Sequence, residues 1–200
     1  MVRAAQPHGL SFHDYHRTVI GYHGTTADIA GRLVDGEPFT LSNNDDDWFG
    51  SGIYFWEYAP KQAWWWAADF KRHDHPAVVG AVIRLGHCFD LLDPANVETL
   101  KQFHADATAK WNEQGFEIPA NGNQHKKLDC AIFNLYYDSQ KSPAIETARA
   151  VYVPTGSAKR VWSRSWIYEQ AHIQVCVRAP KNILAVWRVR RDGHYGKDPE

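Results

Sequence analysis

The hydrophobic and polar positions along the chain fall into short blocks whose spacing changes from segment to segment. Runs rich in β-branched and aromatic residues predict strands. These strands cover residues 18–24, 53–56, 77–92, 149–153, 172–178 and 183–190, and the third is expected to break at Gly86. Capping residues and prolines suited to a first turn predict helices. The helices run from Thr25–Thr26 to about Leu33, from Pro60 to about Phe70, from Asp93–Pro94 to about Trp111 and from Leu128 to Tyr137.

This order of elements predicts a single α+β domain. Strands and helices are interspersed, but no βαβ unit repeats, so a mainly antiparallel sheet is favoured over a doubly wound parallel one. The 200 residues contain no repeat, low-complexity segment or linker, and they suffice to bury a continuous core. We therefore expect one domain over residues 1–200, with its core between residues 18 and 190.

Composition and charge narrow the class of protein. With 44% hydrophobic and 22% charged residues, the chain is globular rather than disordered. The net charge of −1 gives no overall attraction to nucleic acid or anionic lipid, although 22 Lys and Arg permit a local basic patch. The 3 cysteines show no CxxC spacing, which argues against a zinc ribbon and favours core packing. Without a signal peptide or a membrane-length apolar run, a cytoplasmic protein with no membrane partner is expected.

Two segments place chemistry-bearing residues at the ends of predicted strands. His23 ends the first strand and is followed at once by Gly24, which lets another group approach the backbone. Taken alone, a histidine in this position is more often structural. Gly50 and Gly52 directly precede the aromatic strand of Tyr54, which indicates a tight turn and a closely approaching ligand. A phosphate-binding loop is excluded there, because the GxxxxGK[ST] pattern is missing and a strand follows the glycines.

A third segment, the predicted strand 172–178, divides its side chains between two faces. The apolar set is expected to face the core, whereas the pattern alone favours solvent for the other set. The alternative is that the second set lines a cleft. The apolar set is Ile173, Val175 and Val177, and the second set is His172, Gln174 and Cys176.

Taken together, these segments resemble the three motifs of the ADP-ribosyltransferases of the diphtheria-toxin and poly-ADP-ribose-polymerase type. The first motif, His-Gly-[Thr/Ser] on a strand, matches His23-Gly24-Thr25. The second, Gly-x-Gly-[Ile/Val]-Tyr-[Phe/Leu], matches residues 50–55, which read Gly-Ser-Gly-Ile-Tyr-Phe. The third, a late strand that carries Glu or a substitute, matches the strand around Gln174. The resemblance extends over residues 18–190, and only its first two motifs are specific.

The resemblance implies split, mainly antiparallel sheets flanked by short helices, with a site for NAD⁺. In the family the histidine donates to ribose hydroxyls and the next glycine contacts the carboxamide, roles that fall to His23 and Gly24. The motif tyrosine stacks on the nicotinamide ring, which assigns Tyr54. The remaining residues expected to bind the cofactor are Thr25, Gly52 and Tyr58. The alternatives to Tyr58 as a second stacking aromatic are Trp56 and the run Trp64–Trp66.

The third motif departs from the family pattern. The usual Glu stabilises the oxocarbenium-like state that forms as nicotinamide leaves. Here its position falls on Gln174, which forms hydrogen bonds but carries no charge, so chain elongation is not expected. A loop carboxylate is the alternative, although a surface role is commoner for each candidate. The candidates are Glu169, Glu57 and Asp47, of which Glu169 lies just before the strand. The expected catalytic residues are therefore His23, Tyr54, Gln174 and Glu169.

These expectations describe an NAD⁺-dependent mono-ADP-ribosyltransferase with NAD⁺ as co-substrate and no metal. Its acceptor is a macromolecule, either protein or nucleic acid. A compact stand-alone catalytic domain resembles bacterial toxins and phage-defence effectors, which implies an antitoxin or immunity protein as a partner. The alternatives are an NAD⁺ glycohydrolase and a catalytically inactive nucleotide-binding module.

One further surface combination stands apart from the motifs. Arg164 lies between Trp162 and Trp166, a combination that proteins use for base stacking and phosphate contacts. A solvated loop with ordinary charges is the commoner explanation for such a segment.

Overall fold

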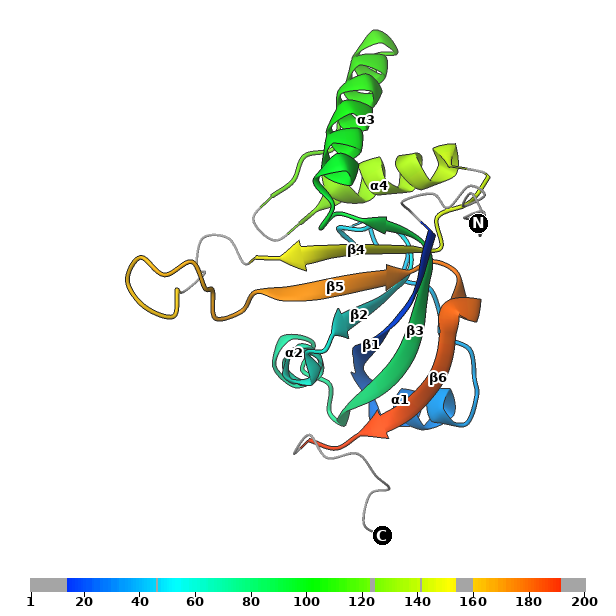
Figure 1. Cartoon of the computed structure of the whole chain (residues 1–200), viewed down its shortest axis with the longest axis vertical. Coiled ribbons are helices and arrows are strands. Elements are labelled where there is room, and N and C mark those ends of the chain that lie inside the picture. Colours follow the sequence, from blue (N-terminus) through cyan, green and yellow to red (C-terminus); the bar gives the residue numbers. More distant parts are fainter. Residues whose placement is uncertain (1–13, 46, 123–124, 141, 154–159, 192–200) are drawn as a thin grey trace, which may run out of the picture.

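The computed structural model describes residues 14–45, 47–122, 125–140, 142–153 and 160–191. Within these ranges the chain forms a mixed α+β unit with a mostly antiparallel sheet (Figure 1). The strands are β1 (Asp14–Thr26), β2 (Ile53–Glu57), β3 (Pro76–Asp90), β4 (Thr147–Tyr152), β5 (His172–Val177) and β6 (Ile183–Val189). The α-helices are α1 (Ala27–Val34), α2 (Pro60–Trp65), α3 (Pro94–Glu113) and α4 (Lys127–Ser139). A π-helical turn (Trp66–Phe70) follows α2, and a 3₁₀ turn (Pro180–Asn182) precedes β6.

The six strands form one sheet rather than the split sheets that the resemblance implies, and its longest strand, β3, pairs with three others. The strand order is β1-β2-β5-β4-β3-β6. A further ladder connects β1 with β3, which are the first and fifth strands in this order. β1 pairs with β3 along residues 76–87. On its other edge, β3 pairs with β6 at residues 78–83 and then with β4 at residues 88–90, where the two strands run parallel. The mainly antiparallel α+β architecture expected from the sequence is thus confirmed.

β3 runs without interruption through Gly86, where the sequence pattern suggested a break. The strand instead carries an irregularity, because its register against β1 shifts between the pairs at Gly86 and Arg84. Gly86 has a φ of 57°, which glycine adopts without a steric penalty. The side-chain alternation changes at the same point, so that Leu85 and Cys88 lie in one core and Phe89 in another. A single strand therefore serves two cores.

The two cores lie on opposite faces of β5. The first core holds Val175 and Val177, together with Val19, Ile53, Phe55, Ala81, Ile83, Leu85 and Cys88. The second core lies beneath α4 and holds Cys176, together with Phe49, Phe89, Phe133, Tyr136, Tyr137, Ile145, Ala148 and Ala150. Cys176 is fully buried, so its face of β5 is covered by protein at this position, and the solvated face favoured by the pattern is wrong here.

The helices begin where the capping signals predict. The Thr26 hydroxyl accepts a hydrogen bond from the Ile29 amide at the start of α1, and the Asp93 carboxylate accepts one from the Ala95 amide at the start of α3. All three cysteines are buried and free, as expected for core packing. Among the described residues, the helices are too short or too polar to cross a bilayer.

Candidate functional site

The three motif segments lie on neighbouring strands, although they are far apart in the sequence. β2 lies between β1, which carries His23, and β5, which carries Gln174. The β1–β2 ladder consists of the pairs made by Gly21 and Tyr22. On its other edge β1 pairs with β3 as far as Thr26, and β2 pairs with β5 along its whole length from Ile53 to Glu57. The sheet therefore opens between β1 and β2 from His23 onward, and we call this gap the β1–β2 opening.

His23 joins the two strands across the opening. Its ring centroid lies 5.6 Å from those of Phe39 and Phe55, and its Nδ1 lies 2.9 Å from the carbonyl oxygen of Tyr54. Because a carbonyl oxygen only accepts, Nδ1 carries the proton and Nε2 keeps its lone pair. Burial lowers the pKa of His23, so the ring is neutral near pH 7. In this tautomer Nε2 accepts a hydrogen bond from a hydroxyl, the reverse of the direction that the resemblance implies.

Gly24 and Gly52 have packing reasons for being glycine. A Cβ on Gly24 would collide with the backbone carbonyl of Ala63, so α2 packs directly against the strand beside the opening. A Cβ on Gly52 would collide with the sulfur of Cys176. Thr25 is buried and pairs with Ala77 on β3, which places it away from solvent. These positions shape the opening through packing, whether or not a ligand also contacts their backbone.

Tyr54 is held by the turn that precedes its own strand. Its hydroxyl donates to the carbonyl of Gly50 at 2.7 Å and accepts from the amide of Phe49 at 3.0 Å. Burial raises the pKa of Tyr54, so the phenol stays protonated. Its ring packs with the second core, whereas the adjacent Phe55 and the ring of His23 lie toward the first. The rings of His23 and Tyr54 therefore face opposite sides of β2, and the Tyr54 carbonyl connects them.

Gln174 is part of an uncharged network on the second-core face of β5. Its Oε1 accepts a hydrogen bond from Nε1 of Trp48 at 2.7 Å. Because the indole nitrogen can only donate, this contact fixes the amide orientation and turns Nε2 toward His172, 3.2 Å from the ring Nε2. The amide therefore uses both ends to link Trp48 with His172.

His172 is the residue that sequence reasoning left out of the predicted site. Its Nδ1 lies 2.8 Å from the carbonyl oxygen of Gln170 and thus carries the proton, which leaves the lone pair on Nε2 facing Gln174. The amide nitrogen of Gln62 on α2 lies 3.1 Å from the same Nδ1, and because both nitrogens carry hydrogen in this tautomer, the approach is a contact rather than a hydrogen bond. The ring stacks on Tyr152 with centroids 5.0 Å apart. Burial lowers the pKa of His172, so the ring is neutral near pH 7. The alternation His172-x-Gln174 was the available signal, since it already placed both side chains on one face.

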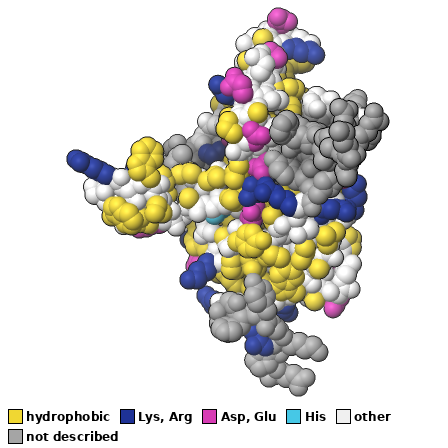
Figure 2. Space-filling model, in the orientation of Figure 1, with side chains coloured by type: hydrophobic (Ala, Val, Ile, Leu, Met, Phe, Trp, Pro, Cys, Tyr) yellow, Lys and Arg dark blue, Asp and Glu magenta, His cyan; other side chains and the backbone are white. Residues whose placement is uncertain are grey.

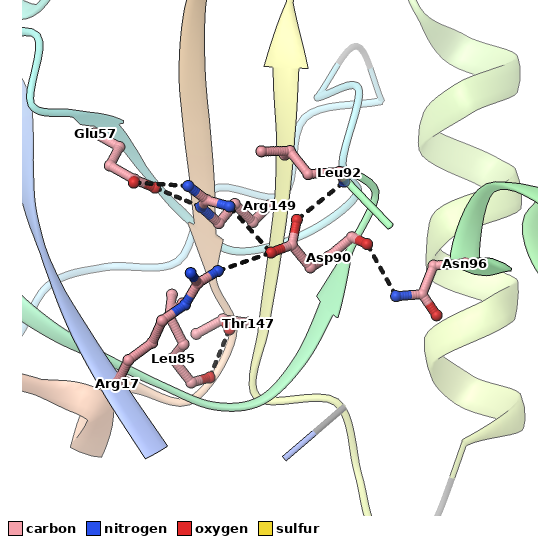
Figure 3. A network of polar contacts seen from close by, with 8 residues as sticks. All are labelled: Arg17, Glu57, Leu85, Asp90, Leu92, Asn96, Thr147 and Arg149. Carbon is pink, nitrogen blue, oxygen red and sulfur yellow. Dashed lines mark hydrogen bonds and ion pairs between the residues drawn. The ribbon is translucent and has the colours of Figure 1, made fainter. Parts of the chain in front are cut away.

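The loop and strand carboxylates are engaged elsewhere or exposed. Glu57 forms a bidentate ion pair with Arg149 at 2.6 and 2.8 Å, and Asp90 pairs with the same guanidinium at 3.0 Å (Figure 3). The side chain of Arg149 is 8% exposed and that of Glu57 is 7% exposed. Asp47 accepts hydrogen bonds from Ser42 and the Asn44 amide, and Glu169 lies exposed before β5.

The aromatic candidates for a second stacking surface separate by exposure. Trp56 is buried against Trp66, whose ring in turn stacks on Phe70. Tyr58 and Trp65 are exposed, and Tyr58 follows β2 with a left-handed φ of 49°. Tyr58 and Trp65 thus remain the candidates on the side of the opening where α2 lies.

No family model, curated protein or solved structure matches this chain. Among the residues that the structure describes, no group of three or more His, Cys, Asp and Glu side chains gathers closely enough to hold a metal ion. A functional assignment therefore depends on the motif residues and on the geometry around the β1–β2 opening.

Proposed function

We propose that the protein is an NAD⁺-dependent mono-ADP-ribosyltransferase whose site is the β1–β2 opening. One observation carries this proposal: the three motif segments occupy adjacent strands, and the sheet opens at the His23-Gly24 pair. Nothing in the spacing of the motifs along the chain requires that adjacency. It supports a common site for His23, Tyr54 and Gln174.

The residues at the opening suit the parts of NAD⁺. The lone pair on Nε2 of His23 is suited to a ribose hydroxyl, and the backbone beside Gly24 and α2 to a carboxamide. The exposed rings of Tyr58 or Trp65 offer flat apolar surfaces of the kind that stack on nicotinamide.

A neutral imidazole takes the place of the missing carboxylate in this proposal. Gln174 cannot accept a proton, and Glu57 is neutralised by Arg149. His172, adjacent to Gln174, has a lone pair on Nε2. As the C1′–N bond breaks, nicotinamide leaves with the bonding electrons, and an acceptor lone pair forms the new bond to C1′. The Gln174 amide gives up its hydrogen bond to Nε2 of His172, and this nitrogen then takes the proton of the acceptor O–H or N–H.

Release of nicotinamide from NAD⁺ by the purified protein, with and without cell lysate, is the direct test. We expect release that rises with lysate and that falls about 10²-fold or more in the His23→Ala variant. His104→Ala is the matched control, because this histidine is exposed on α3, and it should retain wild-type release.

The alternatives give different products in the same assay. With NAD⁺ labelled in the adenosine half, transfer leaves label on macromolecules, and treatment with nuclease or protease then identifies the acceptor class. Free ADP-ribose without labelled macromolecules would mean an NAD⁺ glycohydrolase. NAD⁺ binding without any release would mean an inactive module, and neither binding nor release would overturn the proposal.

A further inference from the structure

A small hairpin of residues 160–168 precedes β5 and projects from the body of the molecule (Figure 1). A bridge between Arg160 and Tyr168 closes it, and the Val161 amide donates to the Ile167 carbonyl at 3.1 Å. At its tip the Ser165 amide donates to the Trp162 carbonyl at 3.1 Å. We call this segment the Trp hairpin. Its shape is maintained by its own hydrogen bonds, so its side chains are presented in a defined arrangement.

Two tryptophans of the hairpin are turned toward solvent. Trp166 is 91% exposed and Trp162 is 63% exposed, and Ile167 is exposed beside them. In Figure 2 the projecting part of the surface carries hydrophobic and basic side chains together. Indole rings bury a large apolar area when they find a partner, and a cluster of them outside any core marks a binding surface.

The charge of the Trp hairpin is positive. Residues 160–172 contain Arg160 and Arg164 and a single acid, Glu169. Arg160 is held inside the hairpin, with its guanidinium 5.0 Å from the ring of Tyr168 and a hydrogen bond to the Ser165 carbonyl. Arg164 is exposed at the tip, where it adopts a left-handed φ of 61°. The turn therefore carries an exposed cation that lies, along the chain, between two exposed tryptophans.

We propose that the Trp hairpin binds single-stranded nucleic acid and presents it as the acceptor of the ADP-ribosyl group. The second half of this inference rests on the proposed function. Unpaired bases of any nucleic-acid sequence stack on aromatic side chains, and an arginine between those side chains contacts the phosphates. A lipid surface fits less well, because the leading turn of the hairpin consists of Ser163 and Arg164 rather than of the apolar residues.

The position of the hairpin along the chain fits an acceptor. Tyr168 closes the hairpin four residues before His172, the proposed proton acceptor. An extended stretch of that length spans at most about 14 Å. A strand stacked on the hairpin therefore lies within a few nucleotides of the site.

Fluorescence anisotropy with labelled oligo(dT) and oligo(U) of about 16 nucleotides, beside a DNA duplex, tests the docking. We expect both single strands to bind in preference to the duplex. The Trp162→Ala/Trp166→Ala double variant should weaken binding at least about 10-fold, and Arg164→Gln should lower the slope of log K against log salt by about 1. Phe116→Ala is the matched control, because Phe116 is an exposed aromatic outside the hairpin, and it should bind normally.

Several outcomes would overturn the docking proposal. These are no single-strand binding, binding that the double variant retains, or binding only to anionic phosphatidylcholine–phosphatidylserine vesicles. Nicotinamide release without acceptor separates this proposal from the proposed function. The double variant should keep that release while label transfer to the oligonucleotide is lost. If no protein preparation releases nicotinamide but hairpin-dependent oligonucleotide binding persists, the docking stands and the transferase function fails.

Discussion

The two faces of the β4–β5 pair carry polar networks of opposite character. Arg149, which pairs with Val175 in the ladder, points toward the first core and joins Glu57 and Asp90. Gln174, which pairs with Ala150, points to the other face and joins Trp48 and His172. The first network is charged and buried, and its groups neutralise one another. The second is uncharged and only partly buried, and it includes a basic ring nitrogen.

This difference separates a structural role from a chemical one. The hydrogen bonds that Arg149 donates to Glu57 raise the pKa of Arg149, and the pair is worth most when both members are present. The carboxylate of Glu57 is therefore committed to folding, even though it lies on a strand of the candidate site. In the proposed function, chemistry depends instead on the neutral histidines, whose nitrogen lone pairs are not neutralised by ion pairs.

The largest effect is expected from Arg149→Ala, which leaves Glu57 buried without its cation and Asp90 paired with Arg17 alone. The free energy of unfolding should fall by about 3–5 kcal/mol, measured by urea denaturation. Arg17 also pairs with Asp90 but is about half exposed, so Arg17→Ala should cost no more than about 1 kcal/mol. Equal losses in the two variants would show that burial does not distinguish the two pairs.

On the uncharged side, His172→Asn should lower the rate of ADP-ribosyl transfer about 10²-fold. The activity of the wild type should rise with pH through the lowered pKa of His172, and the variant should lose this acidic limb. KM for NAD⁺ should change little, because proton acceptance follows binding. Gln174→Ala, which only frees the ring from its amide partner, should have a smaller effect. An acidic limb that survives in His172→Asn would assign the base elsewhere.

Trp48→Phe tests the other end of the same network. The substitution removes the donor to Gln174 Oε1 but keeps an aromatic ring stacked near Phe49. We expect a stability loss of about 1 kcal/mol in thermal or urea unfolding. A change in the acidic limb of the activity profile should accompany it, because the amide is then free to turn away from His172. Unchanged stability and activity together would mean that the amide orientation has no consequence.

The smallest expected effect is a dependence of stability on pH. Burial lowers the pKa of both His23 and His172 in the folded protein, whereas in the unfolded chain the histidines titrate near pKa 6.5. The unfolded state therefore binds more protons below that value, and the free energy of unfolding should decrease from about pH 7 to about pH 5. Urea midpoints across this range measure the decrease. The His172→Asn variant should show a shallower slope, and an identical slope would contradict the assignment.

Much of the fold was predictable from local patterns. The β-branched runs and the caps at Thr26 and Asp93 predicted the strands and helices, since these signals act over a few residues. The course of β3 through Gly86 was not predictable, because continuity there depends on ladders with β1 and β4. The expected helix of residues 60–70 changes to a π-helical turn after Trp65, for which the pattern contained no signal.

The sequence suggested residues for the candidate site but not their spatial relations. Motif spacing identified His23, Tyr54 and Gln174, yet it did not show that the first two rings face opposite sides of β2. The importance of His172 depends on contacts with Gln62 on α2 and with Gln174, and contacts between distant segments leave no periodic trace in the sequence. The ion pair between Glu57 and Arg149 likewise joins distant segments, so the sequence alone does not show that the Glu57 carboxylate is engaged.

The irregularity at Gly86 determines which side chains in the last part of β3 face each core. Because the alternation changes there, Cys88 and Asp90 face inward with Leu85, and Phe89 faces α4. Deleting one residue at this point would exchange those faces, moving Phe89 inward and carrying Asp90 away from Arg149. A one-residue deletion near this strand end should therefore inactivate the protein. In a family of sequences, the length of this strand would vary less than its composition.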